Sequence, residues 1–476
     1  MTVTFDRLAD QLASEYPIRT VPAGDGSLAT VDLVDATHDS RSVVADSLFC
    51  CVPGAGFDGH DFADVAVAAG AGALLVERTL DDVDVPQVVV DSVRSIMGPA
   101  AAIIHERPSN DLSVLGVTGT NGKTSVVHLL DVVLSRLGRR VDTIGTLSGT
   151  RTTPEGPDLQ RQLAGARHRN REIVAMEVSS HALDMHRVDG TTFAAAIFTN
   201  LGHDHLDYHR TVDAYFEAKA KLFTTQFTST SVLNLDDPRG LELASRTDTE
   251  VIGYRLSDAV DLMVDGPSSR FTWNGWPIEL RLAGAHNVSN ALAVAAVARH
   301  LGADDADIAD ALCAVDAPRG RFEFVNVGQS FHVVVDYAHK PEALSAVLDA
   351  ARSVAGEHRV VLVVGCGGDR DRAKRPMMAE IGETKADALV LTSDNPRSED
   401  PRTIIDEMVT GLSNPAKAAI EIDRAAAIAA AVRLAEPGDV VLIAGKGHED
   451  YQIIGDETID FDDRLVAAMA VNEVAR

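Results

Sequence analysis

The stretch LGVTGTNGKTSVVHLL, at residues 115–130, constrains the fold of this chain more than any other part of its sequence. An apolar run typical of a buried strand leads into it, a glycine-rich turn carries Lys123 and Thr124, and apolar residues at helical spacing follow. These features form a phosphate-binding loop, in which backbone N–H groups and the helix N-terminus attract an anion. The strict pattern has a glycine where this chain has Val117, so the loop is a variant. We therefore predict that the central part of the chain binds nucleotide phosphates.

Apolar runs alternate with longer segments through the rest of the chain. From residue 112 the runs LSVLGV, EIVAMEVS, AAAIFTN and SVLNLD indicate buried strands, and a helix is expected at 288–301. This alternation is typical of a mostly parallel sheet with helices on its faces. After APRGRFE, at 317–323, the runs FHVVVDYAH, RVVLVVGCGG, DALVLTSDNP and DVVLIAGKGH each end in polar residues and glycine. Open α/β sheets bind ligands at the carboxyl ends of their strands, so these polar residues are candidates for binding.

The length of the chain suggests about three domains. Residues 1–108 mix short β-rich runs with helical patterns, and HERPSND is typical of a linker. We therefore predict an α/β protein of three domains. They are a small mixed α/β N-terminal domain at 1–108, a central parallel-sheet ATPase domain with the phosphate loop at 109–318, and a Rossmann-like C-terminal domain at 319–476.

Composition narrows the classes of function. The 476 residues carry a net charge of −28, which argues against binding of nucleic acid or anionic membranes by the surface as a whole. No apolar run reaches the ~18 residues of a membrane span, and the N-terminus lacks the pattern of a signal peptide. The four cysteines show no CxxC spacing, and the neighbours Cys50 and Cys51 are interpreted as structural thiols. We expect a cytoplasmic protein that acts as a monomer.

Carboxylates and histidines follow two of the predicted central strands. Glu177, Ser179 and His181 follow IVAMEV, and His203 and His205 follow AAAIFTN. A carboxylate at a strand end beside a phosphate loop is placed to hold Mg²⁺, directly or through water. A nucleotide needs that cation to neutralise charge as its γ-phosphoryl group moves. Zinc is the alternative for the stretch HDHLDYH, but no thiolate or HExxH pattern accompanies it.

A longer series of motifs resembles the Mur ligases, ATP-dependent amino-acid ligases of peptidoglycan precursor synthesis. The motifs are GTNGKTS, MEVSSHAL, TNLGHDHLDYH, YFEAKAKLF, NVSN, GRFE and VDYAHKPEAL, in that order. GGDRDRAKRPMM, DNPR and GKGHEDYQ are similar to motifs of the members that add the third residue of the peptide. Each motif alone is weak evidence, whereas the ordered set extends from Asp39 to Gln452 and covers nearly the whole chain.

The resemblance implies a reaction in two steps. A substrate carboxylate attacks the γ-phosphate of ATP, giving an acyl phosphate and ADP, and an incoming amine then displaces phosphate as the amide forms. The implied substrates are ATP, UDP-N-acetylmuramoyl-L-alanyl-D-glutamate and meso-diaminopimelate, with Mg²⁺ as cofactor and no nucleic-acid partner. Two cations are reasonable, because unscreened repulsion opposes a carboxylate that approaches an anionic phosphate.

The resemblance also implies roles for individual residues. The family's catalytic positions match Lys123, Glu177, His205 and Lys219, and its Mg²⁺ ligands match Thr124, Glu177, His205 and carbamylated Lys219. Its ATP contacts match Gly119, Thr120, Asn121, Gly122, Lys123, Thr124, Ser125, Asn287, Asn290, Arg321 and Asp336. Its UDP-sugar contacts match Ser40, Arg41, Thr152, Thr153, Ser179 and Arg187. Its contacts to the incoming amino acid match Arg370, Asp394, Asn395, Pro396, Arg397, Gly445 and Glu449.

Lys219 is the position where the residues alone and the resemblance disagree. A lysine on an amphipathic helix is usually solvated. The resemblance instead implies a lysine carbamylated by CO₂, which converts a cation into an anion that can ligate or orient Mg²⁺. Lys221 lies nearly on the opposite face of the same helix and is expected to be solvated.

The arginine of DNPR bears on which amino acid is added. A guanidinium binds a carboxylate bidentately, and meso-diaminopimelate has a distal carboxylate that lysine lacks. Without the resemblance, SDNPR indicates only a turn at a strand end. The resemblance implies that Arg397, with Arg370 as a second clamp, favours diaminopimelate, while Asp394 and Glu449 suit its ammonium groups. Two alternatives stay open: a lysine-adding, folylpolyglutamate or cyanophycin-type ligase of the same architecture, and a non-catalytic nucleotide-binding homologue. The DSR and DNPR stretches argue against the first, and the retained catalytic set argues against the second.

Overall fold

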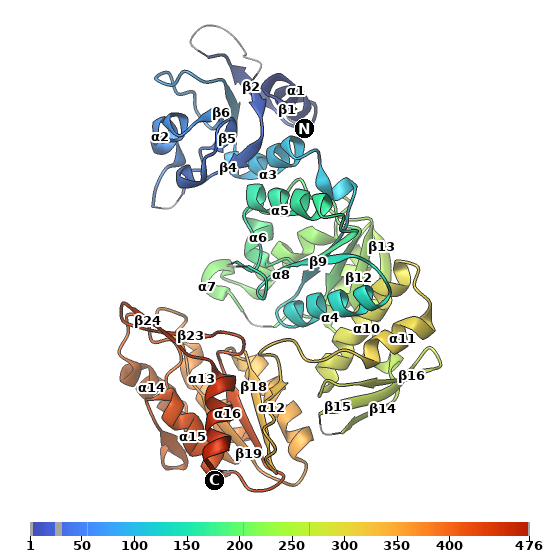
Figure 1. The fold of residues 1–476 in the computed structure, drawn as a ribbon, viewed down its shortest axis with the longest axis vertical. Helices are drawn as coiled ribbons and strands as arrows, with labels where there is room; N and C mark the ends of the chain where they lie inside the picture. The colour runs from blue at the N-terminus through green and yellow to red at the C-terminus, as the bar shows by residue number, and fades with distance from the viewer. Residues whose placement is uncertain are drawn as a thin grey trace.

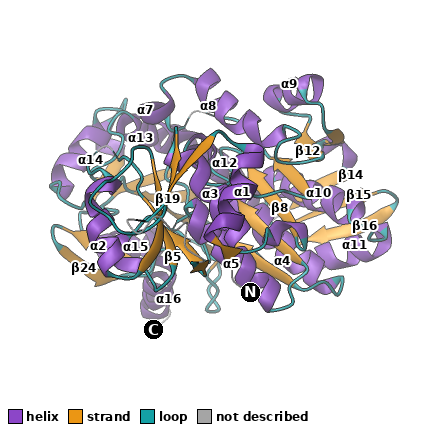
Figure 2. Cartoon of the chain, turned by 90° about the horizontal axis from the view of Figure 1, so that it is seen from above, coloured by secondary structure: helices purple, strands orange, loops and turns teal. Residues whose placement is uncertain are grey.

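Three large sheets, of five or six strands each, follow one another along the chain in the computed structural model, and three smaller sheets of two or three strands accompany them. The structure describes residues 3–23, 31–54, 56–149, 151–202, 204–265 and 267–474. Figure 1 shows the sheets stacked along the long axis, with the two termini at opposite ends, and Figure 2 shows helices around the strands. We call the parts that carry them the N-terminal, central and C-terminal regions. The chain is therefore a three-part α/β protein, as the sequence predicts.

The N-terminal region contains a five-stranded mixed sheet. Its elements are β1 Val3–Thr4, α1 Phe5–Glu15, β2 Ile18–Val21, β3 Asp32–Leu33, β4 Asp35–Thr37, the short helix η1 Ser40–Ser42, β5 Ser47–Cys50, α2 Ala63–Ala68, β6 Ala71–Val76, β7 Gln87–Val90 and α3 Val93–Ile104. The strand order is β2–β7–β6–β5–β4, with β2 antiparallel to β7 and the other pairs parallel. Helices α1 and α3 share one apolar core with the sheet. Cys50 and Cys51 are buried free thiols, which agrees with the structural role expected of them.

The central region is built on a six-stranded parallel sheet. Its elements are β8 Ser113–Thr118, α4 Lys123–Arg136, β9 Val141–Ile144, α5 Gly156–His168, β10 Ile173–Glu177, α6 Ser180–Asp184, β11 Ala195–Phe198, α7 Leu206–His209, α8 Val212–Ala220, β12 Thr230–Asn234, α9 Pro238–Arg246, β13 Glu250–Tyr254, β14 Val260–Asp265, β15 Ser268–Trp273, β16 Trp276–Leu280, α10 Ala285–His300 and α11 Asp305–Cys313. The order β13–β12–β11–β8–β10–β9 places β8 between β10 and β11. Helix α10 begins earlier than the predicted residue 288, because Gly284 at φ +90° supplies the turn ahead of it.

The C-terminal region carries a second six-stranded sheet, in which the four apolar runs predicted after residue 323 are strands β18, β19, β20 and β22. Its elements are β17 Glu323–Phe324, β18 His332–Asp336, α12 Pro341–Ala355, β19 Val360–Val364, α13 Lys374–Lys385, β20 Ala388–Leu391, α14 Pro401–Val409, β21 Ala418–Ile420, α15 Arg424–Leu434, β22 Val440–Ala444, β23 Tyr451–Ile454, β24 Glu457–Asp460 and α16 Asp463–Val474. The order is β17–β18–β22–β19–β20–β21, and β17 is antiparallel. Separate apolar cores cover its two faces, one with α12, α13 and α14 and the other with α15 and α16. Within the described ranges, no helix combines the length and the apolar character needed to cross a membrane.

Three glycines allow the N-terminal region to pack closely against the central region. A Cβ on Gly98 of α3 would collide with the carbonyl oxygen of Asp189, and one on Gly156 would lie 2.9 Å from the Cα of Gly98. Gly190, at φ +83°, stands against Pro99 of the same helix. These contacts leave no space for a methyl group, so α3 packs directly on the backbone of the central region.

The variant Gly98→Ala is expected to be less stable than the wild type, although alanine normally favours a helix. The helical preference contributes about 0.5–1 kcal/mol in favour of alanine. The collision with the Asp189 carbonyl forces two backbones apart, and overpacking of this kind costs about 1–3 kcal/mol. Urea unfolding should therefore show a lower midpoint. Gly165→Ala in α5 is the control, because its Cβ would meet the flexible end of Arg169 at 3.2 Å. A midpoint for Gly98→Ala at or above that of the wild type would contradict the close packing.

Candidate functional site

The phosphate loop runs from the end of β8 into α4, and two of its positions require glycine. A Cβ on Gly119 would collide with the hydroxyl of Thr199, and Gly122 has φ +86° directly before the helix. Lys123 Nζ donates hydrogen bonds to the carbonyl oxygens of Gly119, at 2.8 Å, and Thr120, at 3.0 Å. Burial, and next the charge of Lys340, lower the pKa of Lys123 to about 8. The lysine therefore folds over the loop with its ammonium group facing the space where an anion would lie.

Glu177 binds the loop from the neighbouring strand. Its Oε2 accepts a hydrogen bond from Thr124 Oγ1 at 3.1 Å, and its Oε1 accepts one from the backbone N–H of Thr146 at 2.8 Å. The parallel register of β8 and β10 pairs Val117 with Glu177, which explains why the carboxylate ends up beside the loop. The structure thus places a buried carboxylate next to the threonine hydroxyl at the start of α4.

One cavity of about 440 Å³ brings together the four residues predicted to be catalytic, Lys123, Glu177, His205 and Lys219. Its other lining residues from the central region are Thr120, Asn121, Gly122, Thr124, Ser125, Thr146, Thr152, Ser179, Ser180 and Tyr215. Those from the C-terminal region are Arg321, Tyr337, His339, Lys340, Ala343 and Arg370. The cavity therefore lies between two regions of the chain, and residues far apart in sequence form its opposite walls.

Lys219 is buried, so the interpretation of this residue as a solvated surface lysine is wrong. Its side chain belongs to the buried face of α8 and is 1% exposed. Its Nζ donates to the carbonyl oxygen of Gly119 at 2.9 Å and lies 4.5 Å from the centre of the Tyr215 ring. Burial, and next the charge of Lys123, hold the pKa of Lys219 well below its ordinary value. Lys221 is exposed, as predicted.

Aromatic side chains border the cavity around His205. The ring of His181 lies 4.6 Å from that of His205 and 4.3 Å from that of Tyr208, measured between centroids. Burial lowers the pKa of His205 to about 3, so its imidazole is neutral and has a free electron pair. His203 lies outside the described residues. Among the residues that the structure does describe, no group of three or more His, Cys, Asp or Glu side chains is arranged around a metal position.

Two side chains of the C-terminal region cross the cavity to the central region. Arg321 Nη2 donates to Thr124 Oγ1 at 3.2 Å, and its guanidinium lies 4.6 Å from the centre of the Tyr337 ring. Lys340 forms an ion pair with Asp204. These contacts connect the phosphate loop and the segment after β11 to the C-terminal sheet.

Three of the predicted ATP contacts, Asp336, Asn287 and Asn290, are not among the residues that line the cavity. Asp336, at the end of β18, accepts hydrogen bonds from the backbone N–H groups of Phe322 and Ala338, both at 2.7 Å. Asn287 and Asn290 are buried on α10, and a Cβ on Gly122 would lie 2.7 Å from Asn290 Oδ1. Their contacts to ribose and adenine stay predictions.

The residues predicted to bind the incoming amino acid gather where β19, β20 and β22 end. Asn395 Nδ2 donates to Glu449 Oε2 at 2.8 Å, and a Cβ on Gly445 would lie 3.3 Å from Asp394 Oδ2. Asp394 Oδ1 is buried and, within the described part of the chain, has no hydrogen-bond partner. Burial raises the pKa of Glu449. The buried Lys446 ammonium nitrogen lies 3.9 Å from Asp394 Oδ1 and 3.3 Å from Glu449 Oε2. Two carboxylates that share one cation keep a net negative charge, which is suited to an ammonium group.

Arg397 is held in a constrained conformation beside this acidic pair. Its φ is +52°, its backbone N–H donates to the carbonyl oxygen of Ile453 at 3.0 Å, and its Nη1 donates to that of Gly368 at 2.7 Å. A Cβ on Gly367 would lie 3.0 Å from Arg397 Nη1 and 3.8 Å from Arg370 Cγ. The two predicted clamp arginines therefore flank the same glycine. The carbonyl oxygen of Pro396 leaves Gly368 no space for a side chain, which fixes the loop that carries Arg397.

The predicted UDP-sugar contacts fall into two groups. Thr152 and Ser179 line the cavity, and Thr153 lies just behind them, with its hydroxyl donating to the Glu177 carbonyl oxygen at 2.9 Å. Arg187 Nη2 pairs with Glu155 at 2.9 Å. The second group, Ser40 and Arg41 of η1, belongs to the N-terminal region and is not among the cavity residues; the Arg41 side chain is 87% exposed and pairs with Asp39 at 2.7 Å.

Several cavity residues had no role assigned from the sequence. They are Thr146, Ser180, Tyr215, Tyr337, His339 and Lys340. His339 and Lys340 follow a predicted strand end, which is a signal that could have identified them. Tyr215 faces the cavity from within a helix, and no local pattern distinguishes it from a core residue.

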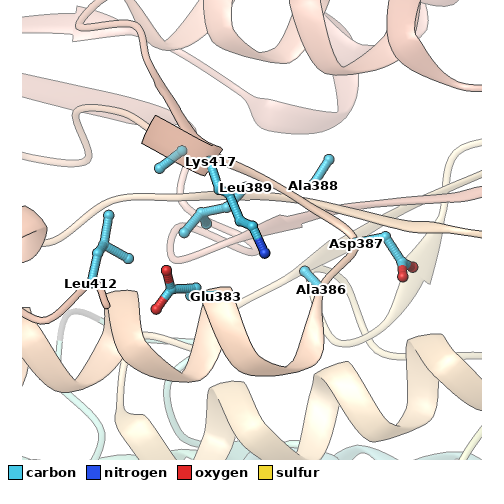
Figure 3. Close-up of a pocket in the computed structure, with 8 residues that line it drawn as sticks. Glu383, Ala386, Asp387, Ala388, Leu389, Leu412 and Lys417 are labelled. Carbon is cyan, nitrogen blue, oxygen red and sulfur yellow. The ribbon is translucent and has the colours of Figure 1, made fainter. Parts of the chain in front are cut away.

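A separate hollow of about 80 Å³ lies at the opposite end of the C-terminal sheet (Figure 3). It is lined by Glu383, Asp387, Leu412 and Lys417 at the start of β20. Glu383 already accepts hydrogen bonds from the backbone N–H groups of Ser413 and Asn414, at 2.8 Å each. This small hollow lies away from the carboxyl ends of the strands, so it adds nothing to the site.

The phosphate loop carries buried lysines and a carboxylate, and it faces a second α/β region with two arginines at its strand ends. Together these features define a nucleotide-dependent ligase. The chain belongs to the Mur ligase family. Its residues 117–298 match the Mur ligase middle domain, 320–447 match the glutamate ligase domain of Mur ligases, and 36–105 match the Mur ligase family catalytic domain.

Relatives and solved structures match the chain along most of its length. The UDP-N-acetylmuramoyl-L-alanyl-D-glutamate–2,6-diaminopimelate ligase of Geobacillus thermodenitrificans is 44% identical over 471 residues, which cover 93% of this chain and 95% of the relative. The ligase of the same name from Streptomyces coelicolor is 42% identical over 98% of this chain and 96% of its own. A solved structure of a ligase of that name has a TM-score of 0.70 and 30% identity, with 100% of both chains covered. MurF ligase from Thermotoga maritima in complex with ADP shares the fold, at 21% identity and a TM-score of 0.62 over 92% of this chain and 96% of its own.

Proposed function

We propose that the chain adds meso-diaminopimelate to UDP-N-acetylmuramoyl-L-alanyl-D-glutamate at the expense of ATP, in peptidoglycan precursor synthesis. The observation that carries the proposal is the arrangement of two half-sites. The phosphate loop with Lys123 forms one wall of the cavity, while Arg370 reaches the cavity from the group of residues that includes Arg397 and Asp394. The names of relatives at 42% and 44% identity support it.

The nucleotide half-site would hold the phosphates of ATP and Mg²⁺. Lys123 would exchange the carbonyl oxygens of its own loop for the β- and γ-phosphates, and Arg321 would approach from the opposite wall. Thr124, Glu177 and His205 would hold Mg²⁺, since a hydroxyl and a carboxylate joined by a 3.1 Å hydrogen bond, with a neutral imidazole in the same cavity, suit a divalent cation. When bound, Mg²⁺ neutralises charge on the transferred phosphoryl group.

The other two substrates would approach from the remaining walls. The Asp394 and Glu449 carboxylates would bind an ammonium group of diaminopimelate and direct its reacting amine, and Arg397 would bind the distal carboxylate. Thr152, Ser179 and Arg187 would hold the sugar and diphosphate, with Ser40 and Arg41 at the uridine end. We propose the three regions as domains at 1–108, 109–318 and 319–476, of which the last two share the ATP cavity.

Lys219 is better suited to be a carbamate than an ammonium ion. Among the described residues it has no ion-pair partner, and an unpaired buried cation is costly. Reaction of the neutral amine with CO₂ yields an anion and releases a proton, which replaces repulsion from Lys123 with attraction. The anion would also orient Mg²⁺.

Protein equilibrated with ¹³C-labelled CO₂ is expected to show a carbamate resonance that is absent in Lys219→Ala. Turnover of that variant should fall by about 10²-fold, because a charged group fixed near the reacting phosphate is lost. Lys221→Ala, two positions along the same segment, is the matched control and should keep both the resonance and the activity. A carbamate signal that persists in Lys219→Ala, or a fully active Lys219→Ala, would show that this lysine is not the modified group.

The proposed function itself is tested by an amide-forming assay. Purified protein receives ATP, Mg²⁺ and UDP-N-acetylmuramoyl-L-alanyl-D-glutamate, with diaminopimelate or lysine offered in parallel. We expect phosphate release and a new amide product with diaminopimelate, and little product with lysine. Preferential use of lysine would favour the lysine-adding alternative, and ATP binding without turnover would favour a non-catalytic homologue.

A further inference from the structure

We propose that Lys340 is a second lysine that binds the γ-phosphoryl group, and that it leaves Asp204 to do so when ATP enters the cavity. The inference rests on the proposed function, since it names a further contact for the same nucleotide. It gives the C-terminal region a direct contact with the γ-phosphoryl group that is transferred.

The position of Lys340 is fixed by its own turn. It directly precedes Pro341, the first residue of α12, and the preceding carbonyl oxygen, that of His339, accepts a hydrogen bond from Lys374 Nζ at 2.9 Å. From this point the side chain crosses to the central region and pairs with Asp204, which lies next to His205. The side chains of the pair are 20% and 11% exposed, so the ion pair is largely shielded from water.

Lys340 faces the same space as the phosphate loop. It lines the 440 Å³ cavity together with Lys123 and Arg321, which stand on opposite walls. The first turn of α12 also approaches the segment after β11, where a Cβ on Gly202 would lie 3.8 Å from Glu342 Cγ. The N-terminus of α12, 15 residues long, adds its partial positive charge at this point. An anion that binds between Lys123 and Arg321 therefore meets a third cation at Lys340.

The ion pair with Asp204 keeps the Lys340 side chain in place until such an anion binds. A carboxylate partner keeps the ammonium group ordered and neutralised while the cavity contains no nucleotide. A terminal phosphate carries more negative charge and offers three acceptor oxygens, so it competes for the ammonium group. The flexible four-carbon stem of lysine lets the ammonium change partner while α12 stays in place. Asp204 is then released beside the proposed metal ligand His205.

Nucleotide binding measured by calorimetry in EDTA distinguishes a γ-phosphoryl contact from a structural role. We expect Lys340→Met to weaken binding of a non-hydrolysable ATP analogue by about 10- to 100-fold, the value of a charge-assisted hydrogen bond. Binding of ADP, which lacks the γ-phosphoryl group, should change less than about 2-fold, because the contact is absent. Lys340→Arg should restore part of the lost affinity. Lys385→Met, which removes a partly exposed lysine paired with Asp349 of α12 at 2.7 Å, is the matched control and should leave both affinities unchanged.

The exchange of partners is tested by combining Lys340→Met with Asp204→Asn. Alone, Asp204→Asn should tighten binding of the analogue, since it removes the competing acceptor, and it should do so much less when Lys340 is already methionine. Equal weakening of ADP and analogue by Lys340→Met, unchanged analogue affinity, or strictly additive effects of the two substitutions would each overturn the proposal. Failure of the wild type to bind either nucleotide, in EDTA and again with Mg²⁺ restored, would instead overturn the proposed function.

Discussion

Lys123→Met is expected to lower turnover by about 10³-fold or more, because it removes a cation placed at the phosphates in the transition state. The protein should remain folded and at least as stable as the wild type. The ammonium group is buried against two carbonyl oxygens of its own loop, and burial depresses its pKa, so the fold already disfavours the charge. Methionine has a similar length and no charge to bury.

The measurement is phosphate release in the complete reaction, together with a thermal melt. Lys221→Met, which removes an exposed lysine, should keep wild-type turnover and melting temperature. Turnover of Lys123→Met above about a tenth of the wild-type rate would contradict the phosphate contact, since one lost charge-assisted contact already exceeds that factor. A lowered melting temperature would show that Lys123 supports the fold instead.

Much of this site could be predicted from local sequence, because local sequence specifies the elements that carry it. The glycines of the phosphate loop, the strand before it and the helix after it lie within one short stretch. Parallel sheets also collect the residues that follow their strands at one edge, which is why Glu177 and Asp394 lie where the strand pattern suggested. Local sequence thus predicts that these residues lie at strand ends, and their roles in binding stay predictions.

Other features of the site depend on packing between segments that are distant in sequence, and no local pattern predicts them. Lys219 has the spacing of a surface lysine, and its burial arises from the loop and the helices that pack around α8. The pairing of Lys340 with Asp204 joins residues 136 positions apart, and it exists because the C-terminal region lies against the central one. The position of Arg41 outside the cavity depends in the same way on how the N-terminal region packs on its neighbour.

Arg397→Ala is expected to raise the KM for diaminopimelate by about 10²- to 10³-fold while ATP binding stays unchanged. Within the described residues, the guanidinium of Arg397 has one hydrogen bond, to the Gly368 carbonyl oxygen, and its remaining donors can bind a carboxylate. Arg370 stands on the other side of Gly367, so the two arginines can hold the distal carboxylate together. Loss of one clamp leaves that carboxylate poorly paired beside the acidic pair.

Comparing diaminopimelate with lysine as the substrate distinguishes the loss of one specific contact from disruption of the loop that carries Arg397. Lysine has no distal carboxylate, so its slow incorporation should be unchanged or improved in Arg397→Ala, and the preference for diaminopimelate should collapse. Arg397→Gly controls for the positive φ of +52°, which costs alanine about 1 kcal/mol, and it should behave like Arg397→Ala. Arg402→Ala, an exposed arginine paired with Asp406 at 2.9 Å, should keep wild-type selectivity. Efficient use of diaminopimelate by Arg397→Ala would contradict the role of Arg397 in binding the distal carboxylate, which is the group that separates diaminopimelate from lysine.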